Sequence, residues 1–265
     1  MTELPPFVRE AGFGPSVLCL HMSAASSSQW RPLMDHISAS FRVLAADLYG
    51  EGRSPPWTSD RDCRIDDELN LLVPLLTAAA PCHLVGHSYG GAVALQMALA
   101  CSKSVKSMVL YEPALWGLLL TTDPEDAGTK EILTVRQALL DHLNSGNETA
   151  AAQDFIDYWS GSGTWESTPE NRRPALIQGV KATAKKWREA VGYPFEPQEL
   201  QRIKVPLLLL TGTASPLAAR LAATRLSRLV PHAELVELPE LGHMGPITHP
   251  DLVNAEIGAF LARQC

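Results

Sequence analysis

The chain has 265 residues, of which 46% are hydrophobic and 19% charged, and its formal net charge is -7 at pH 7. This length and composition predict a chain that buries a substantial core as one domain, with or without an insertion, and they argue against disorder. The acidic balance provides no basic stripe for nucleic acid, and we interpret the short run Lys185-Lys186 as solvated surface.

The cysteines and the N-terminal segment indicate a cellular compartment. The 5 cysteines are odd in number and form no Cys-x-x-Cys pair, so we expect reduced thiols in a cytoplasmic protein. Residues 1–10 show no basic flank followed by an apolar core, and no apolar run is long enough to cross a bilayer. We therefore expect neither export nor membrane insertion, and we expect no metal site and no cofactor.

Apolar runs of strand length alternate with amphipathic segments over most of the chain. Such an alternation is typical of an α/β fold with a mostly parallel central sheet flanked by helices. We expect strands over residues 7–10, 16–20, 41–46, 82–85, 105–110, 205–211 and 233–238, and helices over 69–76, 92–100, 217–229 and 250–263.

An acidic cluster precedes the helix expected at 69–76. Negative charge is favourable in the first turn of a helix, so we interpret the cluster as a helix start rather than a metal site. Its members are Asp60, Asp62, Asp66, Asp67 and Glu68.

The sequence Gly86-His87-Ser88-Tyr89-Gly90 joins the expected strand at 82–85 to the helix at 92–100. It matches the pattern Gly-x-Ser-x-Gly, in which a serine hydroxyl stands on a sharp turn between a strand and a helix. Glycines are needed on both sides because a side chain there would collide with neighbouring backbone. Such a pentapeptide alone is also a common structural loop, but the flanking strand and helix favour a nucleophile.

This strand, turn and helix resemble the nucleophile elbow of the α/β-hydrolase fold family. The resemblance extends over most of the chain and implies a serine nucleophile at Ser88 and a catalytic histidine in a loop after the last strand. Gly242-His243-Met244 lies in that position, so the resemblance assigns the base to His243. It also implies a helical lid, residues 114–202, inserted into a hydrolase core of residues 1–113 and 203–265.

The segment His21-Met22-Ser23 stands where members of the family carry a His-Gly loop ahead of the first major helix. By position, the resemblance implies that the N–H groups of Ser23 and Tyr89 hold the oxyanion of an acyl-transfer reaction. The chain departs from the family pattern because Met22 stands at the usual glycine. The alternative is a polar loop in which Ser28 caps a helix, and the two roles are compatible.

Two further segments are interpreted through the same resemblance. The run from Asp47 to Ser54 resembles a glycine-rich turn of the family, and we expect a structural role in which Asp47 accepts hydrogen bonds from nearby N–H groups. The Trp-rich lid is expected to supply an apolar wall to the site. As substrate-binding residues we expect Met22, Trp116, Trp159 and Met244.

A serine hydroxyl is a weak nucleophile that needs a base, and the base needs a carboxylate that fixes its tautomer. Many members of the family place this acid in a Gly-x-x-Asp turn after the penultimate strand, but here the turn reads Gly212-Thr213-Ala214-Ser215. Ser215 followed by Pro216 instead predicts a helix start with the serine as N-cap. Other branches of the family keep the acid after the strand that follows the elbow helix, and that resemblance selects Glu112.

Two other carboxylates remain as alternative acids. Glu240 lies near His243 in the chain, and Asp126 lies in the expected lid. Glu112 itself could instead be a strand-end carboxylate that caps a neighbouring helix.

Together these residues predict a serine hydrolase that cleaves a small or medium carboxylic ester through an acyl-enzyme. We expect a small-molecule acyl substrate and neither nucleic acid nor a membrane as a partner. Thioesterase, lactonase, carbon-carbon bond hydrolase and perhydrolase activities remain open on the same triad. Two other classes also remain open, a ligand receptor that keeps the fold without turnover and cofactor-free oxygen chemistry. The sequence does not predict an oligomeric state.

Overall fold

The computed structural model describes residues 4–265, without the side chains of residues 188–190. Residues 1–3, which belong to the expected core and to the N-terminal segment discussed above, lie outside the described residues. Each strand expected from the sequence is present. In chain order the strands are β1 (Val8–Ala11), β2 (Ser16–Leu20), β3 (Arg42–Ala46), β4 (Cys82–His87), β5 (Val105–Tyr111), β6 (Leu207–Gly212) and β7 (Glu234–Leu238).

The strands form one sheet in the order β1-β3-β2-β4-β5-β6-β7. β1 pairs antiparallel with β3, and the other pairings are parallel. From β2 the chain moves to β3 on one side, and it then returns to β4 on the other side of β2. Such a switch point leaves a crevice beyond the carboxyl ends of the two central strands. The loop after β2 and the turn after β4 therefore face each other, which brings residues 21–24 near Ser88.

Helices cover both faces of the sheet. Alternate residues of each strand point to opposite faces, and apolar side chains on both faces have to be buried. In β2, Val17 and Cys19 belong to the core packed against α1 (Arg31–Ile37) and α12 (Pro250–Arg263). Leu18 and Leu20 belong to the larger core on the other face. That face is covered by α2 (Ile65–Ala79), α3 (Tyr89–Ala100) and α10 (Leu217–Leu229). The sheet is thus buried on both sides, as continuous apolar strands require.

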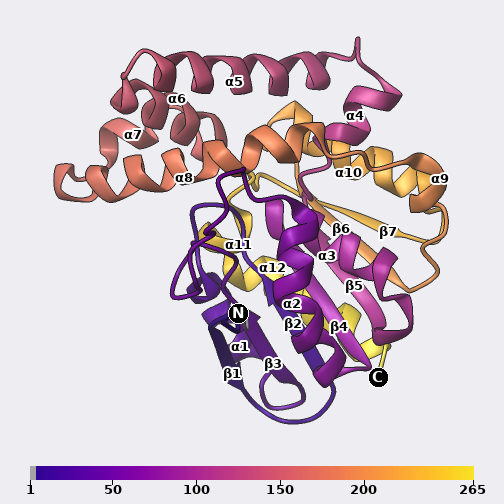
Figure 1. Cartoon of the computed structure of the whole chain (residues 1–265). Coiled ribbons are helices and arrows are strands. Elements are labelled where there is room, and N and C mark those ends of the chain that lie inside the picture. The colour runs from indigo at the N-terminus through magenta and orange to yellow at the C-terminus, as the bar shows by residue number, and fades with distance from the viewer. Residues whose placement is uncertain (1–3) are drawn as a thin grey trace.

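A helical insertion lies between β5 and β6. It contains α4 (Trp116–Thr122), α5 (Ala127–Asn144), α6 (Glu148–Ser160), α7 (Thr164–Ser167), α8 (Arg173–Gly192) and α9 (Pro197–Leu200). Figure 1 shows α5, α6, α7 and α8 as a separate layer across one end of the sheet. A short helix, α11 (Gly245–Thr248), follows β7. Within the described residues, no helix has both the length and the apolar character needed to cross a bilayer.

Two expected helix caps are wrong. Ser26, and not Ser28, caps the short helical turn Ser27–Trp30, because its hydroxyl accepts a hydrogen bond from the Ser28 N–H. Ser215 does not cap α10. Pro216 occupies the N-cap position with extended backbone, and the Ser215 N–H closes a turn onto the Gly212 carbonyl.

The expectation that Lys185 and Lys186 on α8 are both solvated is wrong for one of the two residues. Lys185 is exposed, as expected, but the Lys186 side chain is only 8% exposed and contacts two carboxylates of the core. Sequence alone did not reveal this contact, because its partners lie more than a hundred residues away in the chain.

Substitutions of the two leucines of α12 test how this helix packs on the sheet. Leu261 is fully buried and Leu252 is 54% exposed. Leu261→Ala should lower the free energy of unfolding by about 2 to 5 kcal/mol because it leaves a cavity in the core. Leu252→Ala, the same substitution on the same helix, should change it by less than about 0.5 kcal/mol. Urea denaturation of both variants measures the difference, and equal losses would contradict this packing.

Candidate active site

Ser88 lies on a strained turn between β4 and α3. Its backbone has φ 53° and ψ -119°, a conformation that non-glycine residues rarely adopt. The Ser88 N–H donates to the Tyr111 carbonyl at 3.0 Å, and its own carbonyl accepts from Ala92 at 3.1 Å and Ala114 at 3.0 Å. These bonds to the helix and to the neighbouring strand hold the strained residue in place.

The glycines around Ser88 are required by close backbone contacts. A Cβ atom on Gly86 would lie 2.6 Å from the Gly91 Cα, and one on Gly90 would overlap the carbonyl oxygens of Leu20 and His21. The second clash explains how the elbow comes so close to the loop after β2. Side chains at these positions would push the serine away from that loop.

His243 and Glu112 form a buried pair beside the elbow. His243 Nδ1 lies 2.7 Å from Glu112 Oε2, and the two side chains are 3% and 0% exposed. The other carboxylate oxygen, Oε1, accepts hydrogen bonds from the Thr211 hydroxyl at 2.7 Å and from the Gly212 N–H at 2.8 Å. Glu112 has a positive φ of 43°, so its backbone is strained as well. Three donors thus surround a carboxylate that water does not reach.

The charge of Glu112 follows from these contacts. Burial alone would raise the pKa of its carboxyl, but the hydrogen bond and charge of His243, together with the Gly212 N–H, hold the pKa below its ordinary value. The ionised carboxylate accepts the Nδ1–H of His243, which leaves Nε2 as the nitrogen that can take a proton. The other two candidate acids lie elsewhere, since Asp126 caps α5 and Glu240 is exposed.

The loop that carries His243 is fastened to the sheet by two side chains. The Tyr111 hydroxyl donates to the Gly242 carbonyl at 2.7 Å, and His87 Nε2 lies 2.9 Å from the His243 carbonyl. The Gln29 amide lies 3.1 Å from the other ring nitrogen of His87 and donates to it, so the Nε2–H donates to the carbonyl. Burial and the neighbouring His243 lower the pKa of His87 well below its ordinary value, which keeps this ring neutral.

The backbone N–H groups after β2 differ in their partners. The Met22 N–H donates to Gln29 Oε1 at 3.2 Å, and the Ala24 N–H donates to Glu51 Oε1 at 2.7 Å. Between them, the Ser23 N–H has no acceptor among residues 4–265. Tyr89 is the first residue of α3, so its N–H has no acceptor within the helix. Among the residues that the structure describes, neither of the N–H groups that the resemblance assigned to an oxyanion therefore has a hydrogen-bond acceptor.

Ser88, Ser23 and His243 line one cavity of about 250 Å³. Its wall is formed by the loop after β2, the loop after β7, and the helices α6, α7 and α8 of the insertion. Of the described residues that line it, none apart from His243 is ionisable. Within the described residues no hydrogen bond joins the Ser88 hydroxyl to His243, although both face this cavity.

The expected substrate-binding residues divide into two groups. Met22, Trp159 and Met244 line the cavity, and the Trp159 ring stacks on His243 with 4.2 Å between ring centroids. Trp116 does not line it. It is fully buried behind the wall and contacts Trp159 and Trp187 at centroid distances of 5.9 and 6.4 Å.

Several lining residues were not singled out from the sequence as substrate contacts. Those on α8 share one face of that helix. The signal in the sequence that could have indicated this face is an isolated glycine within a helical pattern. These residues are Ile156, Leu176, Gly179 and Val180, whereas Phe155 and Trp187 are aromatic residues of the lid that was expected to supply the apolar wall.

A sequence profile of the alpha/beta hydrolase fold matches residues 15–250. The chain belongs to the α/β-hydrolase family. It is 28% identical over 249 residues to a protein of Pantoea ananatis (strain LMG 20103) named putative carbamate hydrolase RutD, and this match covers 90% of the chain and 85% of the relative. It is 24% identical over 262 residues to carboxylesterase YbfK of Bacillus subtilis (strain 168), covering 93% and 80%.

Solved structures of α/β-hydrolases share the same fold. A thermophilic esterase from Thermogutta terrifontis superposes with a TM-score of 0.75 at 20% identity, covering 98% of this chain and 93% of that chain. The family and the names of the relatives identify the chain as a hydrolase, and the expected sheet with a helical insertion is confirmed.

The depressed pKa of Glu112 predicts how the stability of this α/β-hydrolase depends on pH. A carboxyl whose pKa is lower in the folded state stabilises the fold above its ordinary pKa of 4.5, and this contribution is lost as the pH falls further. From about pH 5 to about pH 3, the free energy of unfolding of the wild type should therefore fall more steeply than that of Glu112→Gln. Denaturation at a series of pH values measures both slopes. The exposed control Glu240→Gln should follow the wild type, and parallel curves for Glu112→Gln would contradict the assignment.

Proposed function

We propose that this α/β-hydrolase is a serine hydrolase that cleaves small or medium carboxylic esters through an acyl-enzyme. One observation carries the proposal. A buried carboxylate, Glu112, holds the His243 imidazole at 2.7 Å, and that ring faces the same cavity as the hydroxyl of Ser88 on its strained turn. A nucleophile, a base and an orienting acid in this order along the chain are the parts that acyl transfer needs.

In the proposed mechanism, the Ser88 hydroxyl attacks the ester carbonyl while His243 Nε2 takes its proton. The resulting imidazolium is stabilised by the Glu112 carboxylate through its Nδ1–H. The tetrahedral intermediate collapses, the alcohol leaves with the proton from His243, and an acyl-enzyme remains on Ser88. Water activated by the same base then attacks the acyl group and releases the carboxylic acid. The Ser88 hydroxyl is expected to approach Nε2 when a substrate fills the cavity, as catalytic contacts often shorten in the complex.

The oxyanion in this mechanism is held by the N–H groups of Ser23 and Tyr89. Two preformed donors stabilise the negative charge that develops on the carbonyl oxygen, and each is worth roughly 3 kcal/mol in comparable sites. Within the described part of the chain, the Ser23 N–H has no acceptor while the Met22 and Ala24 N–H groups on either side have one each, which supports this role. The methionine at position 22, where the family usually has glycine, is therefore compatible with a Ser23 N–H that donates to the oxyanion.

The insertion acts as a lid in this proposal, with residues 114–202 as its extent. Its helices α6 and α8 supply the apolar wall of the cavity, and apart from His243 no acidic or basic side chain of the described lining faces it. A charged acyl or alcohol group would lose its hydration there without a partner. The substrate is therefore an ester whose buried group is uncharged.

We propose ester cleavage rather than cleavage of the other bonds that the same triad can attack, because a carboxylesterase is among the relatives. Thioesters, lactones, carbamates and carbon-carbon bonds are alternative substrates of the same triad, and an assay of the wild type and Ser88→Ala on one substrate of each kind distinguishes them from esters. A receptor without turnover is disfavoured by the intact pair of His243 and Glu112 beside Ser88.

The triad is tested by three substitutions assayed on p-nitrophenyl esters. Ser88→Ala should reduce hydrolysis to background, and Glu112→Gln should lower kcat about 10³- to 10⁴-fold because His243 loses its orienting charge. Glu240→Gln, an exposed carboxylate in the same region, should retain wild-type kcat. Circular dichroism of each variant checks that the fold is intact.

A fluorophosphonate probe distinguishes the proposal from its alternatives. Labelling at Ser88 that His243→Ala abolishes supports a serine hydrolase. Turnover that survives Ser88→Ala, or tight ligand binding without labelling, would overturn it in favour of another residue or of a receptor.

Gly179 should set the length of the substrate that fits. It lines the cavity from α8, and a Cβ atom there would meet only Ala24 Cβ, at 3.4 Å. The two methyl groups of Gly179→Val would occupy the cavity, so kcat/KM should fall about tenfold or more for octanoyl esters and little for acetyl esters.

Gln178→Val introduces the same valine on the exposed side of α8 and controls for the presence of a β-branched residue in this helix. Two series, graded in acyl length and in alcohol length, show which part of the ester lies against α8. Equal losses at all lengths in both series would contradict a role of Gly179 in substrate length.

A further inference from the structure

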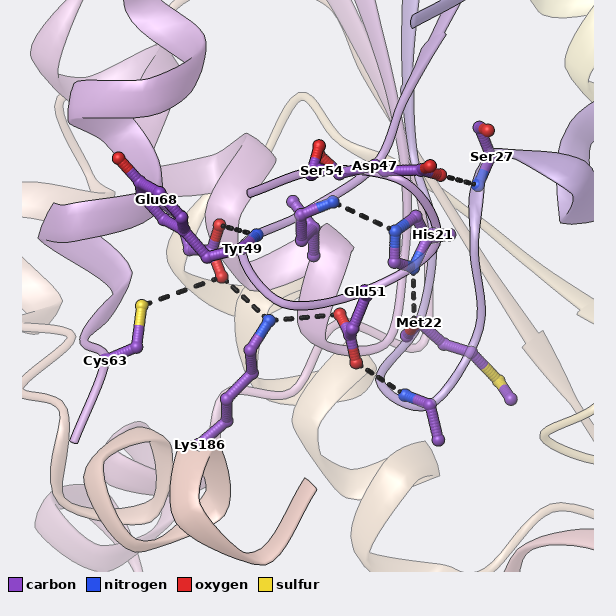
Figure 2. A network of polar contacts seen from close by, with 12 residues as sticks. His21, Met22, Ser27, Asp47, Tyr49, Glu51, Ser54, Cys63, Glu68 and Lys186 are labelled. Carbon is purple, nitrogen blue, oxygen red and sulfur yellow. Dashed lines mark hydrogen bonds and ion pairs between the residues drawn. The ribbon is translucent and has the colours of Figure 1, made fainter. Parts of the chain in front are cut away.

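Lys186 places a positive charge in the interior between the insertion and the core. Its ammonium lies 3.0 Å from Glu51 Oε2 and 2.9 Å from Glu68 Oε1. The side chains of Lys186, Glu51 and Glu68 are 8%, 6% and 0% exposed. Glu51 belongs to the turn after β3, Glu68 to α2, and Lys186 to α8, so three separate elements meet at one buried ion cluster (Figure 2).

The cluster reaches the oxyanion loop through Glu51. While Oε2 of this carboxylate contacts Lys186, its Oε1 accepts the Ala24 N–H at 2.7 Å. Ala24 follows Ser23 directly and has a positive φ of 58°. Such a conformation is unfavourable for alanine and persists only where other contacts hold it. The Glu51 carboxylate is the contact that the structure provides.

The peptide bond on the other side of Ser23 is fixed as well. The Leu48 N–H donates to His21 Nε2 at 3.1 Å, so the proton of this ring lies on Nδ1 and is donated to the Met22 carbonyl at 2.7 Å (Figure 2). In a trans peptide the carbonyl and the following N–H point in opposite directions. Holding the Met22 carbonyl on His21 therefore turns the Ser23 N–H away from that ring.

The second proposed donor residue contacts the same ammonium. Lys186 Nζ lies 5.2 Å from the centroid of the Tyr89 ring, which is fully buried. A cation above an aromatic face is attracted to it. One side chain of the insertion thus contacts Tyr89 directly and the neighbour of Ser23 through a single carboxylate.

We propose that Lys186 is a positioning residue of the oxyanion hole, which holds Glu51 so that this carboxylate fixes the Ala24 N–H and leaves the Ser23 N–H directed at the substrate. This inference rests on the proposed function. It implies that α8 has to be docked on the core for the oxyanion hole to be complete, so that the helix that forms the cavity wall also conditions the chemistry.

The alternative is a cluster that only fastens α8 to the core. The two carboxylates separate these roles, because both contact Lys186 but only Glu51 contacts the oxyanion loop. Glu68 Oε2 accepts the Tyr49 N–H at 3.0 Å, away from Ser23. A glutamine at either position can satisfy Lys186 or the backbone N–H, but not both. Glu51→Gln and Glu68→Gln are therefore a matched pair.

The experiment measures kcat and KM for p-nitrophenyl esters, with the thermal midpoint of each variant as a check of folding. Lys186→Met should lower kcat at least tenfold with KM changed less than threefold, because the lost interaction acts on the transition state. Lys186→Arg should recover at least half of the lost activity on a logarithmic scale. Glu51→Gln should resemble Lys186→Met, whereas Glu68→Gln should lower the thermal midpoint and leave kcat within threefold of the wild type.

Lys185→Met removes a positive charge from the exposed neighbouring position and should leave kcat unchanged. Wild-type kcat in Lys186→Met, or equal losses of kcat in the two glutamine variants, would overturn the inference while the proposed function stands. If Lys186→Met does not fold, the kcat values of Glu51→Gln and Glu68→Gln alone test the inference by the same criterion. A wild-type protein without Ser88-dependent turnover would instead overturn the proposed function, and the inference with it.

Discussion

The buried carboxylate of Glu112 is the charge on which the arrangement of the site depends. An ionised carboxylate removed from water is stable only where donors replace its hydration. Here those donors come from His243 and from Thr211 and Gly212 at the end of β6. They are separated from Glu112 by about a hundred residues or more in sequence, so the charge is satisfied only when β5, β6 and the loop after β7 are in register. The contacts that stabilise the charge therefore also place the imidazole.

A second buried charge cluster contacts the loop after β2. Lys186, Glu51 and Glu68 join the insertion to the loop after β2, as the Glu112 pair joins β5 to the loop after β7. Ser88 itself is held on a strained turn by backbone hydrogen bonds. Groups fixed in this way during folding need no rearrangement when charge develops during a reaction, which is the source of most electrostatic stabilisation in enzymes.

The fold and the central residues of the site could be predicted because their signals are local. Apolar runs of strand length predicted the seven strands, and the glycines around Ser88 predicted a turn whose backbone contacts the structure now shows. Glu112 was selected by the resemblance to branches of the family that keep the acid after the strand following the elbow helix, since the other family position carries Ser215, which is not acidic. Its role and that of His243 remain proposals, although the structure brings the two side chains together.

What the sequence did not predict depends on packing between distant segments. Lys185 and Lys186 are identical in type and adjacent, yet within the described residues only Lys186 contacts carboxylates, because the direction of each side chain depends on how α8 docks on the core. The same is true of the lid aromatics, where Trp159 reaches the cavity and Trp116 lies behind it. Gly179 was not singled out from the sequence, because its place against Ala24 depends on the same docking of α8.

The contact between α8 and the core is an ion cluster, and its chemistry bears on why the contact is there. If this contact only had to be stable, well-packed apolar residues would serve as well, since replacing a buried ion pair by them is often neutral or stabilising. Apolar surfaces, however, can slide against each other at little cost, whereas an ammonium between two carboxylates accepts few arrangements. Because one of those carboxylates also holds the backbone next to Ser23, the restriction is passed on to the loop. A requirement for one particular loop geometry explains the lysine better than a requirement for stability.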